Sequence, residues 1–229
     1  QSAAHHHGAD RAGAGLRENE NIMANKQLGF HINLQNCSGC KACQIACRDR
    51  NNSNVGVLWR RVYEISGGDW QTDGNALVDN TFSYFMSASC QHCTNPACVP
   101  VCPTGALHKR AEDGLVVIDS SACVGCRYCE WACHYGAPQF NAETGVMSKC
   151  DGCQDLIAAG KPPACVSSCQ MRVIDYGDMA ELRARYGDNS DVFPFPDPSI
   201  THPNIIFTLH RDAVASDSES AKILNAEEV

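Results

Sequence analysis

Sixteen cysteines are the residues of this 229-residue chain whose type and spacing could do chemistry. They fall into four groups of four, and no cysteine is left over. The first and third groups read C-x2-C-x2-C-x3-C, the second reads C-x2-C-x4-C-x3-C and the fourth reads C-x2-C-x11-C-x3-C. The groups are Cys37, Cys40, Cys43 and Cys47; Cys90, Cys93, Cys98 and Cys102; Cys123, Cys126, Cys129 and Cys133; and Cys150, Cys153, Cys165 and Cys169. This internal repeat of sulfur ligands indicates bound metal.

Three kinds of cysteine chemistry compete for the pattern. An even number of cysteines allows disulfides, but disulfide frameworks belong mainly to small domains, and four closely spaced cysteines are awkward to pair with one another. Zinc sites use C-x2-C pairs about 15–20 residues apart. Only the fourth group comes near that spacing, and its second pair is C-x3-C. The C-x2-C-x2-C-x3-C run is that of bacterial ferredoxins, so the pattern favours [4Fe-4S] clusters over zinc and disulfides.

The spacing has a physical reason. Three thiolates at intervals of three let one loop wrap a cube and reach three of its iron corners. The fourth cysteine lies one helical turn further on, where the chain has moved away, and it is expected to bind a neighbouring cube. Four motifs would make two such pairs. Because every cluster then has four cysteine ligands, no iron keeps an open position, which favours one-electron transfer over catalysis at the clusters.

Five segments also carry a resemblance to a known family, over about residues 28–210. They are CSGCKACQIACRD, WRRVYEISGGDWQ, CQHCTNPACVPVCPTGALHKR, CVGCRYCEWACHYGAPQFN and KCDGCQDLIAAGKPPACVSSC. In these segments the chain resembles the four-cluster iron–sulfur subunits of respiratory molybdopterin oxidoreductases, most closely those of the dimethyl sulfoxide reductase type. The resemblance implies four [4Fe-4S] clusters as cofactors and no catalytic residue in this chain.

The family's pairing joins the first cysteine group with the fourth and the second with the third. The resemblance therefore implies four ligand sets, numbered here as clusters 1 to 4. These are Cys37, Cys40, Cys43 and Cys169 (cluster 1); Cys150, Cys153, Cys165 and Cys47 (cluster 2); Cys90, Cys93, Cys98 and Cys133 (cluster 3); and Cys123, Cys126, Cys129 and Cys102 (cluster 4). The spacing by itself indicates only that ligands cross between motifs.

The chain departs from the family pattern at the proline after the last cysteine, and it keeps a cysteine where some relatives have tryptophan. The ferredoxin run usually has a proline after its last cysteine, and only Cys102 keeps one. That departure is tolerable because the proline shapes a turn and is not a ligand. In nitrate-reductase relatives a tryptophan replaces one cysteine and leaves a three-iron cluster. The corresponding position here is Cys126, so all four clusters are expected to hold four irons.

The resemblance implies a place in a membrane complex. The expected role is to pass single electrons from an integral-membrane, quinol-oxidising anchor subunit to a catalytic subunit that holds molybdopterin. The chain is expected to reach the membrane through a partner, at the periplasmic face of the bacterial inner membrane. The alternatives are the same role in a polysulfide, thiosulfate, tetrathionate or selenate reductase or a formate dehydrogenase, or a free-standing polyferredoxin.

Composition excludes several other classes. The formal charge of −8 argues against an unaided nucleic-acid-binding protein, and no apolar run reaches the length of a transmembrane helix. Leu, Ile, Val and Phe together make up only about 19 % of the chain, a level at which disorder becomes a serious option. We therefore expect the cysteines to organise the interior. Residues 1–26, with three consecutive histidines, are expected to be a disordered extension or a tag.

The elements that must position the cysteines predict an α+β fold: two bacterial 2[4Fe-4S] ferredoxin-like modules with inserted strands and an extended C-terminal tail. Residues 27–50 with 145–180 are expected to form the first module, 51–84 an insertion, 85–144 the second module, and 181–229 a C-terminal helix and tail. Strands are predicted at Phe30–Leu34, Ala106–Arg110, Leu115–Asp119 and Met171–Tyr176. A capped helix is predicted over 178–187, and short helices after the last cysteine of several groups. A turn is expected at Gly67-Gly68, and prolines from Pro194 onward are expected to preclude regular structure.

Reduced clusters carry negative charge that must be compensated if it is buried. The candidate cations lie near cysteines in the sequence: Lys41, Arg48, Lys109, Arg110, Arg127, Lys149 and Arg172. Each is more often a solvated surface charge. The aromatic residues Trp59, Trp70, Tyr128 and Trp131 could shield clusters or line an interface, with core filling the more common role. His92 lies inside the second cysteine loop, where packing is expected rather than proton transfer.

Overall fold

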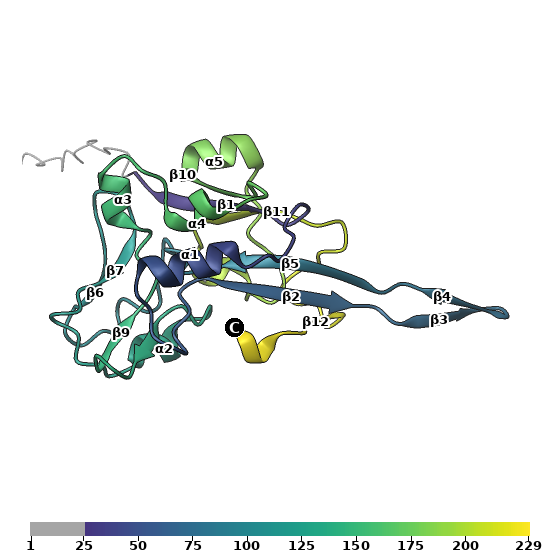
Figure 1. Cartoon of the computed structure of the whole chain (residues 1–229), viewed down its shortest axis with the longest axis horizontal. Helices are drawn as coiled ribbons and strands as arrows, with labels where there is room; N and C mark the ends of the chain where they lie inside the picture. The colour runs from purple at the N-terminus through teal and green to yellow at the C-terminus, as the bar shows by residue number, and fades with distance from the viewer. Residues whose placement is uncertain (1–25) are drawn as a thin grey trace, which may run out of the picture.

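The computed structural model describes residues 26–229, so the predicted extension lies outside the described residues except for Lys26. The first predicted strand is β1 (Leu28–Asn33), the middle strand of a sheet in the order β10-β1-β11 (Figure 1). β10 (Ile174–Asp178) pairs with β1 antiparallel, and β11 (Ile205–Thr208) pairs with it parallel. Five of the six residues of β1 are buried, because both faces of this sheet are covered. The segments predicted as one module, 27–50 and 145–180, therefore meet at β1 and β10.

The predicted helix over 178–187 is α5 (Met179–Tyr186), which lies across the β10-β1-β11 sheet (Figure 1). Its first turn is capped by Asp178, whose carboxylate accepts a hydrogen bond from the Ala180 N–H at 2.8 Å. The helix ends at Gly187, which has a φ of 85° and so stands where a side chain would be strained.

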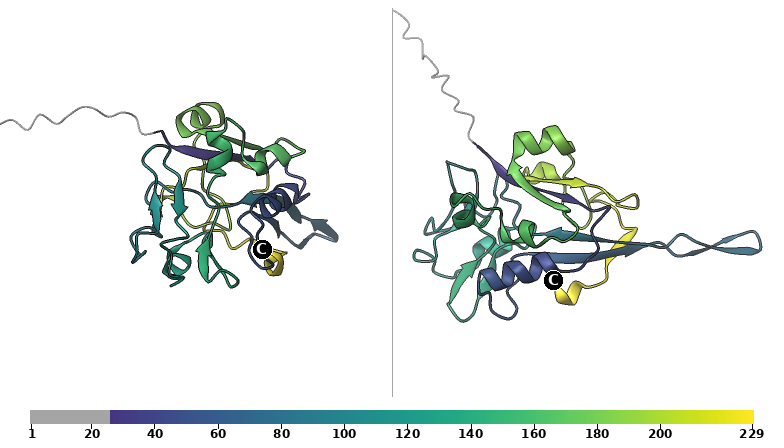
Figure 2. Two further views of the ribbon diagram at one scale, coloured as in Figure 1. Left: turned by 60° about the vertical axis from the view of Figure 1, so that its left-hand side comes forward. Right: turned by 45° about the horizontal axis from the view of Figure 1, so that its top comes forward.

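A second, antiparallel sheet has the order β12-β2-β5. It consists of β2 (Arg61–Gly67), β5 (Phe82–Ala88) and the short β12 (Ala221–Ile223). Beyond this sheet the ribbon continues as β3 (Trp70–Asp73) and β4 (Ala76–Asp79), which project from the body as a long arm (Figures 1 and 2). All eight residues of these two strands are exposed.

The turn expected at Gly67-Gly68 is wrong. Gly67 is still paired with Phe82, and the chain reverses only at Gly74 and Asn75, with Gly74 at a φ of 60°. The two glycines instead interrupt the ribbon where its β2–β5 part passes into its β3–β4 part. A two-residue reversal requires a positive φ, and Gly74 supplies it as well as Gly68 would.

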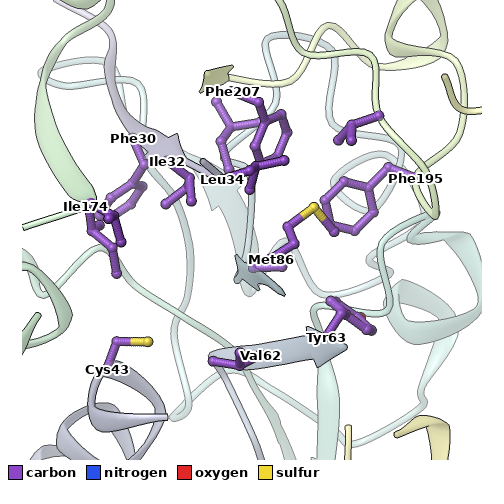
Figure 3. Packing of buried hydrophobic residues seen from close by; sticks show 14 of the residues in the cluster. Phe30, Ile32, Leu34, Cys43, Val62, Tyr63, Met86, Ile174, Phe195 and Phe207 are labelled. Atoms are coloured by element: carbon purple, nitrogen blue, oxygen red, sulfur yellow. The ribbon is translucent and has the colours of Figure 1, made fainter. Parts of the chain in front are cut away.

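The main apolar core lies between the two three-stranded sheets (Figure 3). It contains twenty buried residues, of which six are Phe or Tyr and four are cysteines. Large rings such as Phe30 and Phe207 fill the space that a chain poor in aliphatic residues leaves open. Cys43 lies at the margin of this core, on the first helix (Figure 3). Apolar packing and cysteine sites thus adjoin each other.

The short helices were predicted to follow the last cysteine of several groups. In the structure they lie among the cysteine ligands instead. They are α1 (Ala42–Arg50), α2 (Tyr128–Ala132), α3 (Gln154–Ala158) and α4 (Ala164–Ser168). In all four groups the last two cysteines are four residues apart, and in three of the groups one turn of α1, α2 or α4 spans that interval. The prediction was wrong because the turn that separates the ligands is itself the helix.

Two hairpins carry the remaining strands. β6 (Leu107–Lys109) and β7 (Val116–Ile118) confirm the hairpin predicted over 106–119. β8 (Gln139–Asn141) pairs with β9 (Val146–Ser148), a hairpin that the sequence pattern did not predict. With small sheets and few short helices, the predicted α+β class is confirmed.

The C-terminal tail has regular structure, contrary to the prediction from its prolines. It forms the 3-10 helices η1 (Pro198–Ile200) and η2 (Ala226–Glu228) in addition to β11 and β12. Both strands begin after Pro203, and they form because β11 pairs with β1 and β12 pairs with β2. Asn225 then fastens the tail end: it accepts from the Glu64 N–H at 2.8 Å and donates to the Val62 carbonyl at 2.9 Å. Within residues 26–229, no helix is long and apolar enough to cross a membrane.

Candidate metal centres

Three cavities are each lined by four cysteines that come from two different groups. The cysteines around them are Cys37, Cys40, Cys43 and Cys169 in the first; Cys90, Cys93, Cys98 and Cys133 in the second; and Cys102, Cys123, Cys126 and Cys129 in the third. In each cavity three cysteines belong to one group, and the fourth is the last cysteine of another. These sulfurs surround a space rather than pairing, since all sixteen cysteines are free thiols.

The other four cysteines, Cys47, Cys150, Cys153 and Cys165, are all buried. The effect of these cysteines on one another's pKa indicates that they lie close together. Burial raises the pKa of Cys47 to about 12, and Cys165 and Cys153 contribute to the rise. The pKa of Cys150 lies well above its usual range, first through burial and then through Cys47. Helices α1 and α4, which carry Cys47 and Cys165, are in contact.

The cysteine loops share a backbone device that suits an anionic group. The second residue after the first cysteine of each group has a positive φ: 67° at Gly39, 43° at His92, 68° at Gly125 and 75° at Gly152. Left-handed residues within such turns aim successive N–H groups toward a common concavity, where they bind anions. Three of the four positions are glycine, the residue that adopts this conformation without strain.

Backbone N–H groups also donate directly to cysteine sulfurs. Each of four such hydrogen bonds measures 3.4 Å from N to Sγ: Leu107 to Cys102, Ala137 to Cys133, Met147 to Cys123, and Val173 to Cys169. Three of these acceptors are the last cysteines of their groups. Hydrogen bonds to sulfur stabilise thiolate and raise the reduction potential of an iron–sulfur cluster. The donor set therefore fits [4Fe-4S] clusters.

Burial controls the protonation of most of these thiols. It raises the pKa of Cys37 and Cys129 to about 11 and that of Cys93 to about 12. Cys102 differs: hydrogen bonds from the Leu107 N–H and from Thr104 outweigh its burial and hold its pKa below the usual value. Because thiolate is the form that binds metal, iron must displace protons from most of these sites.

His92 performs the packing role expected of it. It is completely buried, and its Nδ1 accepts a hydrogen bond from the Val116 N–H at 3.0 Å. Burial, then Lys149 and Lys109, lower the pKa of His92 far below its usual value, so the ring is neutral. Its Nε2 lies 3.9 Å from the sulfur of Cys150. A residue in the loop of one cysteine set therefore approaches a sulfur of another.

We expect His92→Ala to lower the free energy of unfolding of the loaded protein by about 2–4 kcal/mol. The substitution leaves the buried Val116 N–H without an acceptor, opens a cavity and puts alanine at a φ of 43°. Anaerobic denaturant unfolding measures the loss. His108→Ala, in the exposed part of β6, is the matched control and should change stability by less than about 0.5 kcal/mol. Equal effects of the two substitutions would contradict a structural role for His92.

The seven predicted cations divide by exposure. Lys149 is buried and donates to the carbonyls of Val116 and Cys150, whereas Lys109 is half-buried and donates to the Cys93 carbonyl at 2.8 Å. Lys41 and Arg110 are partly exposed and pair with acidic side chains. The other three are exposed: Arg48, Arg127 and Arg172.

The sequence analysis missed a more deeply buried cation, Arg60, whose exposed fraction is 2 %. It directly precedes β2, and strand alternation places it on the same side as the buried Val62. That alternation was the signal that could have found it. Burial lowers the pKa of Arg60, but the nearby cysteines, which are anionic once they bind metal, outweigh burial and raise it, so Arg60 remains charged.

The sequence favoured a role in filling the core for four aromatic residues, and this prediction is wrong for three of them. Trp70, Tyr128 and Trp131 have exposed fractions of 62 %, 51 % and 73 %. Trp59 is partly buried and donates from Nε1 to the Ser148 hydroxyl at 3.1 Å. The exposed rings are large apolar surfaces on the outside of the molecule, which is typical of protein interfaces.

Comparison with known proteins agrees with the cysteine sites of the structure. Residues 81–179 match a family model described as a 4Fe-4S dicluster domain. The chain is 47 % identical over 203 residues to the B subunit of anaerobic dimethyl sulfoxide reductase from Escherichia coli (strain K12), covering 89 % of this chain and 98 % of the relative. It is 44 % identical over 206 residues to the B subunit of the same reductase from Haemophilus influenzae, covering 89 % and 100 %. Selenate reductase subunit beta of Thauera selenatis is 38 % identical over 263 residues, covering 79 % and 80 %.

Proposed function

The chain belongs to the family of iron–sulfur B subunits of anaerobic dimethyl sulfoxide reductases, and from this premise we propose that it relays single electrons through four [4Fe-4S] clusters. It acts as an electron-transfer subunit of a reductase complex, and catalysis belongs to a partner subunit. The observation that carries the proposal is the enclosure of three cavities by four cysteines each, with the last four cysteines buried together.

The proposed ligands of the clusters are the four sets implied by the family pairing. Cluster 1 takes Cys37, Cys40, Cys43 and Cys169; cluster 2 takes Cys47, Cys150, Cys153 and Cys165; cluster 3 takes Cys90, Cys93, Cys98 and Cys133; and cluster 4 takes Cys102, Cys123, Cys126 and Cys129. The cavities support sets 1, 3 and 4, and the mutual electrostatic influence of buried thiols supports set 2. The first and second ferredoxin-like modules would hold clusters 1 and 2 and clusters 3 and 4, respectively.

The exposure of the cysteines supports a chain of clusters in which the two terminal clusters lie near the surface. Cys40 of cluster 1 is exposed, and Cys102, Cys123 and Cys126 of cluster 4 are partly exposed. Every ligand of cluster 2 is buried, and of cluster 3 only Cys133 is partly exposed. Clusters 1 and 4 would therefore exchange electrons with partners, while clusters 2 and 3 connect them inside the protein.

Exposed apolar side chains flank both proposed ends. Ile45 and Met171, each 50 % exposed, lie in sequence beside ligands of cluster 1, and Val124, Tyr128 and Trp131 lie beside those of cluster 4. Such side chains are typical of surfaces that bind other proteins. The proposed partners are a molybdopterin-containing catalytic subunit and an integral-membrane anchor that oxidises quinol, at the periplasmic face of the inner membrane.

Metal analysis and co-purification test this function. Protein isolated anaerobically from native membranes should be brown, contain about 16 iron and about 16 sulfide per chain, and elute with a molybdopterin-containing subunit. Isolated protein that contains zinc and no sulfide would contradict the proposal of [4Fe-4S] clusters. Migration as a free, fully loaded chain would favour a polyferredoxin, and a complex that reduces selenate or thiosulfate but not dimethyl sulfoxide would favour another branch of the family.

A further inference from the structure

Arg60 is a full positive charge in the interior of the protein. Its exposed fraction is 2 %, and its guanidinium packs over the ring of Phe30, 5.2 Å from the centroid. Within residues 26–229 it forms no ion pair with a carboxylate. Burying an unpaired charge is strongly unfavourable, so something anionic must face it in the functional protein.

Two serines, one in β5 and one just after it, hold the guanidinium in place. Nη1 donates to the Ser87 hydroxyl at 3.0 Å, and Nη2 donates to the Ser89 hydroxyl at 2.9 Å. Ser87 and Ser89 are themselves buried. Neutral hydroxyls orient the arginine without cancelling its charge, which stays available to other groups nearby.

Ser87 extends this contact to a cluster ligand. Its hydroxyl oxygen lies 3.3 Å from the sulfur of Cys43. Since the oxygen already accepts from Arg60, its proton is free to point at that sulfur. The three groups form a relay in which the cation polarises the hydroxyl and the hydroxyl donates to the ligand.

The anions that face Arg60 belong to two clusters. The cysteines that act on its charge are Cys165, Cys43, Cys150 and Cys47, and each becomes an anionic thiolate when it binds iron. Cys43 belongs to the set of cluster 1, and the other three belong to that of cluster 2. All four side chains are buried, where charges act on one another more strongly than at the surface.

We propose that Arg60 is a shared counter-charge for clusters 1 and 2 and sets the reduction potentials of both, with Ser87 transmitting part of its effect to cluster 1. This inference rests on the proposed function, because it requires the clusters. A fixed positive charge stabilises the more negative, reduced state, so it raises both potentials together. Arg60 is thus a positioning and tuning residue and not a ligand.

Lys149 offers a matched comparison within the same chain. It is 3 % exposed and donates to the Cys150 carbonyl, beside cluster 2. Its charge also acts on Cys98 and Cys133, two ligands of cluster 3. Removing Lys149 should therefore affect clusters 2 and 3, whereas removing Arg60 should affect clusters 1 and 2.

Redox-titrated electron paramagnetic resonance of the complex in its membranes tests the inference, with signals assigned by single cysteine substitutions. Arg60→Gln should lower the reduced-to-oxidised ratio of clusters 1 and 2 at fixed potential by about tenfold, equal to about 59 mV for a one-electron couple. Clusters 3 and 4 should not shift. Arg60→Lys should restore most of the change, Ser87→Ala should shift cluster 1 alone, and Lys149→Met should shift clusters 2 and 3.

Unchanged potentials in Arg60→Gln, or an equal shift of all four clusters, would overturn the inference. If Arg60→Gln fails to assemble, Ser87→Ala decides: a cluster 1 potential equal to that of the unsubstituted protein refutes the relay and with it the proposal. Failure of the proposed function has a different signature, namely the absence of four cluster signals from the unsubstituted protein.

Discussion

Cys37→Ser and Cys169→Ser are expected to abolish the same cluster signal and to leave the other three in place. The two cysteines lie far apart in the sequence but line one cavity, together with Cys40 and Cys43. Either substitution removes the thiolate ligand from one iron of the same cluster. Because the proposed function passes single electrons through every cluster in turn, quinol-dependent reduction should fall by at least about 100-fold, equal to about 2.7 kcal/mol. Electron paramagnetic resonance of reduced membranes identifies the lost signal.

The matched control comes from the same motif as Cys37. Cys47→Ser should remove a different signal, the one that Cys150→Ser also removes, since Cys47 lies with the other buried set. Loss of one signal by Cys37→Ser and Cys47→Ser alike would mean that each motif holds its own cluster. That outcome would refute the crossed ligand sets.

Removal of iron should unfold the hairpin region of β6 to β9 and leave the two three-stranded sheets folded. The apolar cluster among these hairpins contains five buried residues, and two of those are the ligands Cys98 and Cys129. Two-stranded hairpins are marginally stable alone. The main core, in contrast, joins six strands around large aromatic residues. Anaerobic chelation followed by hydrogen exchange should accelerate exchange in β6, β7, β8 and β9 at least about 100-fold, a loss of about 2.7 kcal/mol of local stability.

The loaded protein in the same buffer is the reference for this measurement. Amides of β1, β2 and β5 should change by less than about tenfold. Uniform loss of protection would show that the apolar core also depends on the clusters. Uniform retention would show that the hairpins fold without them.

Local spacing explains what the sequence could predict. The repeated cysteine intervals identify cluster chemistry because the ligands of one cube lie mostly within one loop. The hairpin of β6 and β7 and the cap at Asp178 are likewise local, and both are present. The family resemblance added the ligand sets, which spacing alone left open.

Long-range packing explains what the sequence could not predict. Low aliphatic content suggested that the cysteines organise the interior, yet aromatic rings from several distant segments build a core between the sheets. Prolines hid β11 because the partner that makes it a strand, β1, lies at the opposite end of the chain. Arg60 was passed over because the candidate cations were chosen by their closeness to cysteines in the sequence. Strand alternation with the buried Val62 could have placed it in the interior, but only its contacts with Ser87 and Ser89 reveal its role.

The parallel pairing of β1 with β11 has a consequence for synthesis. The ribosome makes β1 before its partners, since β10 begins about 140 residues and β11 about 170 residues after the end of β1. At about 5–20 residues per second, the first strand waits many seconds with an unfilled edge on each side. Residues 85–144 are complete about 30 residues before β10 begins. Maturation should therefore proceed from the middle of the polypeptide outward, and a chaperone that holds the nascent N-terminal part would protect it during the delay.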